Sequence, residues 1–409
     1  MSELNNIPKH WQIKKLGEVC DFVGGGTPSK SCSSYWNGSI AWASIKDIKG
    51  QFLTKTIDYI TEDGVENSAT NIANPNEIIL ATRINPGKPI ICKLRSAINQ
   101  DLKIAKPKET INSLFLYYSF LNIEKEVLKK SNGTTVLGIN LNNLKEIPIP
   151  IPPLSEQLVL VSKIEELLSD LENGKQQLIT AQQQLKVYRQ SLLKAAFTST
   201  TLSDRDTIFN EYILKDVTQK IQIGPFGTQL HKEDYIENGI PLINPMHIQD
   251  GKIEANFSYS IKEEKRNSLP NYILEEGDVI MGRRGEMGRC GLVTNKERGW
   301  FCGTGSLYFR PLKERLSSQF LFYYLTSQPI KKYLNDNAGG TTMANLNLKI
   351  VNEIPISLPS LKEQKQIVEI LESKLTVCDK IAETISQSLQ QAETLQQSIL
   401  KKAFEGKLV

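Results

Sequence analysis

Residues 147–157 have the sequence Ile-Pro-Ile-Pro-Ile-Pro-Pro-Leu-Ser-Glu-Gln, and they open a helix-like stretch that ends with Ala196-Phe197. A second copy of the pattern occupies residues 354–364, Ile-Pro-Ile-Ser-Leu-Pro-Ser-Leu-Lys-Glu-Gln, and its stretch ends with Ala403-Phe404. The two copies stand 207 positions apart at both ends. A repeat of about half the chain length predicts two similar units joined head to tail.

Both helix-like stretches carry apolar residues at intervals of seven, the spacing of a coiled-coil seam. Because each stretch has such a seam, we predict that the two helices pair. At about 1.5 Å per residue, the 44 positions from 154 to 197 would span on the order of 66 Å. The predicted seam residues are Ile164, Leu171, Leu178, Leu185 and Leu192 in the first helix, and Leu371, Leu375, Ile385, Leu389 and Ile399 in the second.

The segment before each helix has the pattern of a sheet-rich domain. Short apolar runs at 40–43, 57–60, 78–82 and 89–94 are separated by Gly, Pro, Asn and Asp, and a helix-like stretch follows at 113–130. The same order returns over residues 214–352. The sequence therefore predicts an α+β fold with sheet-containing domains at 1–152 and 201–358, and long helices at 153–200 and 359–409.

Composition favours an ordinary globular protein, since 40% of the 409 residues are hydrophobic and 23% are charged. The chain has no apolar run of about eighteen residues and a polar amino terminus, so we expect a cytoplasmic protein without a membrane segment. The net charge of +4 is too small to indicate nucleic-acid binding by itself. The six cysteines form no Cys-x-x-Cys pair, which favours buried free thiols over a metal site or a disulfide framework.

Motifs for catalysis are incomplete in this sequence. Residues 24–30, Gly-Gly-Gly-Thr-Pro-Ser-Lys, lack the spacing of a phosphate-binding loop, and Pro28 removes a backbone donor, so a turn is favoured. The stretch Asn244-Pro245-Met246 lacks the second proline and the aromatic residue of an amino-methyltransferase motif. We therefore predict no methyltransferase, ATPase or nuclease site.

The most suggestive polar clusters are the loop Arg283-Arg284-Gly285-Glu286-Met287-Gly288-Arg289 and its counterpart at 82–88. An arginine fork can bind a guanine edge or a phosphate, whereas lysine neutralises phosphate as a point charge. The alternative, in which these side chains merely pair with local acids, stays open for each of them. The candidate DNA-binding residues are Lys46, Arg83, Lys88, Arg283, Arg284 and Arg289.

A family resemblance rests on three duplicated features: the proline-rich entries ending in Glu-Gln, the long helices ending in Ala-Phe, and the loops Gly133-Thr134-Thr135 and Gly340-Thr341-Thr342. With these features the chain resembles the DNA-specificity subunit of Type I restriction-modification systems. The resemblance implies two target recognition domains and two helices that form an antiparallel coiled coil with internal pseudo-two-fold symmetry. It also implies that the two domains recognise the two parts of a bipartite site in double-stranded DNA.

The resemblance further implies a subunit without catalytic activity that binds no cofactor of its own. Two modification subunits would bring S-adenosylmethionine and the methylating site, and restriction subunits would add ATP- and Mg-dependent translocation and cleavage. Because the loops of the two halves differ, we predict that the DNA site is asymmetric. The length of the helices would set its spacer, so adding or removing a helical turn within 176–184 should change the spacer alone.

Two hypotheses from other classes remain open at this point. One is a coiled-coil scaffold that joins two protein-binding domains without touching DNA. The other is an enzyme that acts alone, which the missing cofactor loop disfavours.

Overall fold

The computed structural model of the chain describes residues 7–133, 135–197, 208–339 and 345–408, and it divides into two compact units. Unit 1 consists of Met1–Leu178 and Gln387–Val409, and unit 2 consists of Ile179–Ser386. Each unit therefore contains one sheet-containing domain together with parts of both long helices. This grouping differs from the four consecutive segments predicted from the sequence, because each helix packs on one domain near its start and on the other near its end.

Unit 1 contains a five-stranded sheet of order β2-β10-β7-β8-β4, a four-stranded sheet of order β5-β3-β9-β6 and the pair β1-β11. The strands are β1 (Gln12–Lys15), β2 (Cys20–Gly24), β3 (Trp36–Ala43), β4 (Phe52–Leu53), β5 (Asp58–Ile60), β6 (Asn71–Ala73), β7 (Ile78–Ala81), β8 (Pro89–Cys92), β9 (Ser96–Ile98), β10 (Leu102–Pro107) and β11 (Pro148–Ile151). The helices are α1 (Leu16–Val19), η2 (Ser33–Tyr35), η3 (Ile45–Asp47), α2 (Glu62–Glu66), α3 (Ser113–Asn122), α4 (Glu124–Lys129), α5 (Leu141–Lys145) and α6 (Leu154–Ala196), which continues into unit 2.

Unit 2 contains sheets of order β13-β22-β19-β20 and β14-β18-β15-β21, and the pairs β12-β23 and β16-β17. The strands are β12 (Asn210–Ile213), β13 (Thr218–Ile223), β14 (Tyr235–Ile236), β15 (Ile240–Ile243), β16 (Ile248–Gln249), β17 (Lys252–Ile253), β18 (Ser260–Ile261), β19 (Val279–Gly282), β20 (Cys290–Leu292), β21 (Phe301–Cys302), β22 (Ser306–Pro311) and β23 (Pro355–Leu358). The helices are α7 (Leu214–Val217), η4 (Lys232–Asp234), η5 (Pro245–His247), α8 (Glu263–Ser268), η6 (Pro270–Tyr272), α9 (Ser318–Thr326), α10 (Gln328–Asn337), α11 (Leu348–Asn352) and α12 (Leu361–Phe404), which returns to unit 1.

The two units repeat one architecture, so the predicted α+β fold with an internal repeat is confirmed. The order β2-β10-β7-β8 in unit 1 matches β13-β22-β19-β20 in unit 2, and β11 pairs with β1 as β23 pairs with β12. The apolar runs predicted as strands correspond to β3, β5, β7 and β8. The helix-like stretch at 113–130 differs in one respect, since it forms two helices, α3 and α4, joined at Ile123.

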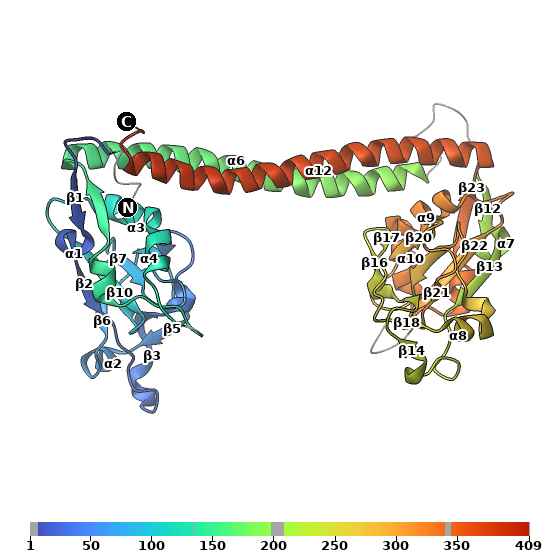
Figure 1. Cartoon of the computed structure of the whole chain (residues 1–409), viewed down its shortest axis with the longest axis horizontal. Coiled ribbons are helices and arrows are strands. Elements are labelled where there is room, and N and C mark those ends of the chain that lie inside the picture. Colours follow the sequence, from blue (N-terminus) through green and yellow to red (C-terminus); the bar gives the residue numbers. More distant parts are fainter. Residues whose placement is uncertain (1–6, 134, 198–207, 340–344, 409) are drawn as a thin grey trace. The chain divides into compact units, whose positions relative to one another are not determined.

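The long helices pair in antiparallel fashion, as each unit shows separately (Figure 1). In unit 1 the early part of α6 shares a buried cluster with the end of α12, through Leu160, Val161, Ile164, Leu400, Ala403 and Phe404. In unit 2 the end of α6 shares a buried cluster with the early part of α12, through Leu192, Leu193, Ala196, Leu371, Leu375 and Cys378. The predicted coiled coil is therefore confirmed.

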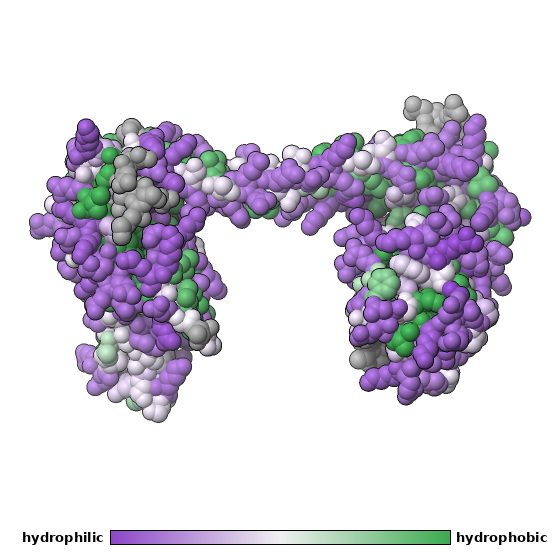
Figure 2. Space-filling model, in the orientation of Figure 1, coloured by the Kyte–Doolittle hydropathy of each residue, from purple (hydrophilic) through white to green (hydrophobic). Residues whose placement is uncertain are grey.

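None of the ten predicted seam residues is exposed. Six are buried, namely Ile164, Leu192, Leu371, Leu375, Ile385 and Ile399, and four are half-buried, namely Leu171, Leu178, Leu185 and Leu389. The outer surface of the paired helices is mainly hydrophilic (Figure 2). None of the described helices is long and apolar enough to cross a membrane.

The glutamine of each Glu-Gln motif joins a domain to the start of a long helix. In unit 1 the buried amide of Gln157 donates from Nε2 to the carbonyl oxygens of Pro152 at 3.0 Å and Thr110 at 3.1 Å. Its Oε1 accepts a hydrogen bond from the backbone N–H of Asn112 at 2.9 Å. Asn112 is the residue that caps α3 with its own side chain, so Gln157 holds α3 and α6 in one arrangement.

Unit 2 repeats this arrangement with Gln364. Its Nε2 donates to the carbonyl oxygens of Arg315 at 2.8 Å and Pro359 at 3.0 Å, and its Oε1 accepts from the backbone N–H of Ser317 at 2.9 Å. Ser317 caps α9, the counterpart of α3. The duplicated motif is thus explained by one hydrogen-bond pattern that is used twice.

We predict that Gln157→Leu lowers the stability of unit 1 by about 2–4 kcal/mol, because three partner groups lose a hydrogen bond that leucine cannot replace. Hydrogen exchange should accelerate in α3 and in the first turns of α6. The matched control is Gln184→Leu, at an exposed position of the same helix, which should change stability by about 0.5 kcal/mol or less. Equal protection of α3 in both variants would contradict the role given to Gln157.

Candidate nucleic-acid interface

The two candidate loops occupy equivalent places in the two units. Residues 82–88 join β7 to β8, residues 283–289 join β19 to β20, and the loops stand 201 positions apart. At the start of each loop a backbone N–H bonds across the sheet, from Thr82 to Asp101 O at 2.9 Å and from Arg283 to Gly305 O at 3.0 Å. Near the end of each loop a glycine has positive φ, +90° at Gly87 and +74° at Gly288. The loops therefore share a backbone while most of their side chains differ.

Each loop is supported by the segment that precedes α5 or α11. Arg83 forms a β-bridge with Gly138, and Arg284 forms the same bridge with Asn345. Next to each bridge, a backbone N–H donates to the first residue of the loop. Ile139 N bonds to Thr82 O at 2.9 Å in unit 1, and Leu346 N bonds to Arg283 O at 3.0 Å in unit 2. The support is thus duplicated as well. Of the two Gly-Thr-Thr motifs, residues 134 and 340–344 lie outside the described part of the chain.

Arg83, Lys88 and Lys46 are all accessible in unit 1. The side chain of Arg83 is exposed, with Nη1 3.4 Å from Asp101 Oδ1, a pair that contributes little at the surface. Lys88 is half-buried, and Lys46 is exposed on η3. Ile45, next to Lys46, packs on the cluster that contains Ala81 at the end of β7, so η3 is held beside the same sheet. Arg83 and Lys46 remain candidates for DNA contact, and Lys88 is partly available.

Arg283 occupies a different environment from its neighbour, because it is only 6% exposed. Its Nε donates to Thr304 O at 3.0 Å, and its guanidinium lies 5.8 Å from the centre of the Phe226 ring. Burial, together with the positive charge of Arg284, lowers the pKa of Arg283. Arg283 therefore supports the base of the loop, which argues against the DNA contact predicted for it. In unit 1 the hydroxyl of Thr82 has the corresponding role, donating to Asp101 O at 2.8 Å.

Arg284 and Arg289 differ in whether their guanidinium groups are paired with neighbouring residues of the same unit. Arg284 is exposed and forms no ion pair with any residue that the structure describes. Arg289 is half-buried and donates to Pro245 O at 3.2 Å and to Glu286 Oε2 at 3.0 Å. The hydrogen bond from Arg289 holds the pKa of Glu286 below its ordinary value. Arg284 is therefore the freer of the two for a partner.

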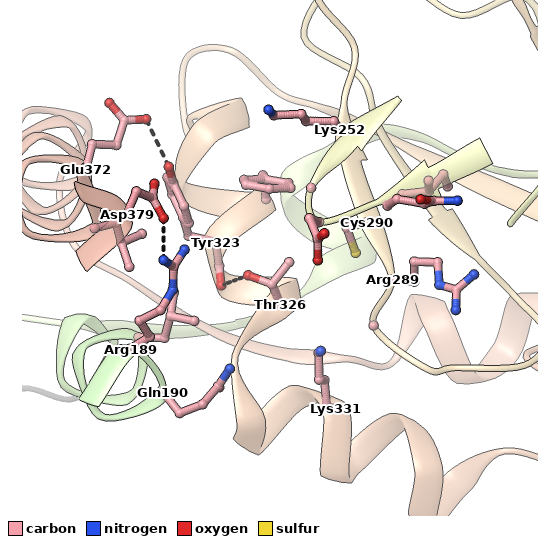
Figure 3. Close-up of a pocket in the computed structure, with 18 of the residues that line it drawn as sticks. Arg189, Gln190, Lys252, Arg289, Cys290, Tyr323, Thr326, Lys331, Glu372 and Asp379 are labelled. Atoms are coloured by element: carbon pink, nitrogen blue, oxygen red, sulfur yellow. Dashed lines mark hydrogen bonds and ion pairs between the residues drawn. The ribbon is translucent and has the colours of Figure 1, made fainter. Parts of the chain in front are cut away.

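A groove of about 720 Å³ lies beside Arg289 in unit 2 (Figure 3). Arg189 and Gln190 reach it from α6, Glu372 and Asp379 from α12, and Lys331 from α10. Arg189 pairs with Asp379, the hydroxyl of Tyr323 donates to Glu372 at 3.3 Å, and Lys331 lies 3.8 Å from Glu286. Acidic and basic groups are thus both present, and the groove is not a channel of positive charge.

Several exposed apolar side chains lie on the same parts of the two units, and the sequence patterns did not single them out. Ile84 stands at the tip of the unit 1 loop, and Met246 lies on η5 at the position of Lys46 on η3. Ile57 and Tyr59 lie at or next to β5, Phe257 and Tyr259 lie just before β18, and all four are exposed. Apolar residues of strand-like runs are usually assigned to a core, so the sequence offered no signal that would have marked them.

His247 lies beneath this surface in unit 2. It is 3% exposed, its Nδ1 lies 3.0 Å from Leu242 O, and its ring centre lies 5.7 Å from that of Tyr259. Its Nε2 has no hydrogen-bond partner among the described residues. Burial lowers the pKa of His247, and the contact with Leu242 O opposes this only in part. The histidine is therefore held neutral as a structural group.

Among the described residues, no group of three His, Cys, Asp or Glu side chains is arranged to hold a metal ion. The six cysteines are free thiols, and all but Cys32 are buried, as predicted.

Comparison with known proteins agrees with the duplicated architecture. The model of the Type I restriction modification DNA specificity domain matches the chain twice, at residues 8–181 and 209–391. The specificity subunit of the Type I restriction enzyme EcoBI from Escherichia coli is 26% identical over 82% of this chain and 74% of its own length. The MjaVIII specificity subunit from Methanocaldococcus jannaschii is 24% identical over 98% of this chain and 94% of its own length.

A solved structure concerned with complex assembly and conformational transition of a type I R-M system contains a chain of similar fold. Its TM-score is 0.75 at 20% identity, over 98% of this chain and 99% of that chain. At this identity the likeness supports the fold alone.

We predict that unit 2 loses stability as the pH falls below about 6.5, the ordinary pKa of histidine. Because the pKa of His247 is lowered in the folded state, the unfolded chain takes up the proton first, and the loss continues until the pH is below the folded pKa. His247→Asn should be less stable at pH 7.5 and should show a smaller drop in unfolding temperature from pH 7.5 to pH 5. The control is His231→Asn, at an exposed position, which should keep the full drop.

Proposed function

The chain belongs to the family of Type I restriction-modification DNA specificity proteins, and we propose that it recognises an asymmetric, bipartite DNA site on behalf of catalytic partner subunits. Its place as the DNA-specificity subunit of such a system follows from the family, which covers both halves of the chain. The asymmetry of the site and the division of work among subunits are the proposal.

One observation carries the proposal: two loops with the same backbone present different side chains. Unit 1 presents Arg83, Ile84 and Lys88, where unit 2 presents Arg284, Gly285 and Arg289. Loops fixed at both ends by a sheet can hold side chains at defined positions against the edges of base pairs. Because the side chains differ, the base pairs that fit them differ too. Each unit therefore recognises its own half-site.

The partners we propose are double-stranded DNA, two modification subunits and restriction subunits. The modification subunits supply S-adenosylmethionine and the methylating site, the restriction subunits supply ATP- and Mg-dependent steps, and this chain binds none of these cofactors. The charge of the chain supports a shared DNA interface. Since the net charge is only +4 and the groove beside Arg289 contains acids as well as bases, part of the phosphate neutralisation must come from the partners.

The paired helices suit a spacer-setting role. They are continuous over 43 residues in α6 and 44 residues in α12, and apolar side chains recur every seven positions along each of them. A helix of this length extends about 65 Å, at about 1.5 Å per residue. We propose that the length of the pair sets the number of unrecognised base pairs between the half-sites.

The alternative is a coiled-coil scaffold that joins two protein-binding domains without touching DNA. Mapping of methylated adenines in cells that express the chain with its modification subunits tests the choice. The proposal requires one asymmetric bipartite motif that disappears without this chain. A complex that assembles but neither shifts DNA in a gel nor gives such a motif would favour the scaffold.

We predict that Arg284→Ala weakens recognition of one half-site and Arg83→Ala weakens recognition of the other, by about 1–3 kcal/mol for each base-edge contact. Equilibrium binding of the assembled methyltransferase to duplexes altered in one half-site at a time measures this. The control is Arg298→Ala, at an exposed position of unit 2 outside the loop, which should bind as the original chain does. Arg283→Ala should instead destabilise unit 2. If Arg284→Ala bound every duplex as the unchanged chain does, this residue would have no part in recognition.

We also predict that seven residues inserted after Leu178, together with seven inserted after Ile385, lengthen the spacer and leave both half-sites unchanged. Seven residues keep the heptad seam and add about 10 Å of helix, or about three base pairs at 3.4 Å each. Methylation mapping gives the new motif directly. The matched control carries one of the two insertions and should weaken pairing of the helices. A changed half-site with an unchanged spacer would refute the spacer-setting role.

A further inference from the structure

Ile84 has a backbone conformation that isoleucine rarely adopts. Its φ is +66°, in the left-handed region, where a β-branched side chain is strained. The conformation is fixed by two hydrogen bonds, from Ile84 N to Leu137 O at 2.8 Å and from Asn85 N to Arg83 O at 2.8 Å. The equivalent residue of unit 2 is Gly285, with φ +79°, which needs no side chain to make the same turn. A glycine would thus serve the backbone better than isoleucine does.

The side chain of Ile84 makes no packing contact in a hydrophobic cluster of the described residues that would offset this strain. It is 54% exposed and belongs to none of the hydrophobic clusters formed by the described residues. Strained residues of this kind persist where their side chains serve a function. An exposed isoleucine in a strained conformation therefore points to a contact with something outside the chain.

The surroundings of Ile84 narrow the kind of partner. Arg83 precedes it, exposed Asn85 follows it, and Lys88 ends the loop. An apolar tip between cations fits a ligand with an apolar group set between negative charges, rather than the apolar patch of a protein. The backbone N–H of Ile84 is already bonded to Leu137 O, so it is not available to a partner. The isoleucine side chain has no polar atom and offers apolar contact alone. In the major groove of DNA, the apolar group on a base edge is the methyl group of thymine, with phosphates on either side.

We propose that Ile84 contacts the 5-methyl group of a thymine in the half-site recognised by unit 1. This inference rests on the proposed function and adds one specificity-determining residue to it. Gly285 has no side chain to make such a contact, so the equivalent position of unit 2 contributes none. The difference gives the two half-sites one defined chemical distinction.

The test uses the full chain assembled with its modification subunits and the duplex identified by methylation mapping. Each thymine of the site is replaced singly by deoxyuridine, which removes only the methyl group. We expect one such change, in the half-site that Arg83→Ala affects, to weaken binding about threefold to fivefold, as expected for one buried methyl group. Ile84→Gly should lose the same factor on the unmodified duplex and show no further loss with deoxyuridine at that position.

A second variant and a stability measurement separate the contact from the fold. Ile84→Asn introduces a side chain that tolerates positive φ but has no methyl group, and it should behave as Ile84→Gly does. Both variants should unfold at the same temperature as the original chain or at a higher one, because the strain is relieved. The control is Ile13→Ala, which removes an exposed isoleucine of β1 away from the loop and should keep the thymine preference.

The outcomes are distinct. The inference is overturned if no thymine of that half-site shows the effect of deoxyuridine, or if Ile84→Gly keeps that effect. It is also overturned if Ile84→Gly weakens assembly with the modification subunits while the assembled complex keeps its preference for thymine over deoxyuridine. If the unchanged complex recognises no DNA motif, the proposed function fails instead.

Discussion

The buried amides of Gln157 and Gln364 fix the geometry on which the rest of the structure depends. Each amide donates to two backbone carbonyl groups and accepts from the capping residue of α3 or α9, so one side chain joins a domain to the start of a long helix. A buried amide with all three bonds formed specifies one arrangement, because any other leaves polar groups without partners. The strands β11 and β23 end just before these helices, and the helices begin in a fixed direction for the same reason.

The loops at 82–88 and 283–289 share one backbone conformation in the two units but differ in most of their side chains. The bridges of Arg83 with Gly138 and of Arg284 with Asn345 place both loops in the same way. The loops can then differ in charge, in apolar surface and in local pairing without a change of fold. This separation suits the proposed function, in which each unit recognises its own half-site. A change at a loop tip alters contacts with a partner and not the core.

The charges of the chain support recognition shared with partner subunits. Arg289 is engaged with Glu286, and Arg189 is engaged with Asp379, so a good part of the positive charge near the groove is used within the fold. The exposed residues Arg83, Lys46 and Arg284 remain. A few accessible cations are enough to fix register against a duplex, but they cannot by themselves supply the salt-dependent affinity that many phosphate contacts give.

The sequence by itself determined the repeat, the paired helices, their seam and four strands of the first domain, β3, β5, β7 and β8, because those features depend on periodic apolar residues and local turn signals. It also marked both loops through their glycines and arginines. Only the tertiary structure separated Arg283 from Arg284: the first is buried against Phe226 and Thr304, which lie far from it in the chain, and the second is exposed. Likewise, the strained turn at Ile84 depends on a bond to Leu137, and the two compact units combine segments from both ends of the chain. Contacts between distant residues leave no periodic trace in the sequence, so burial, strain and pairing at the candidate site were decided by the fold.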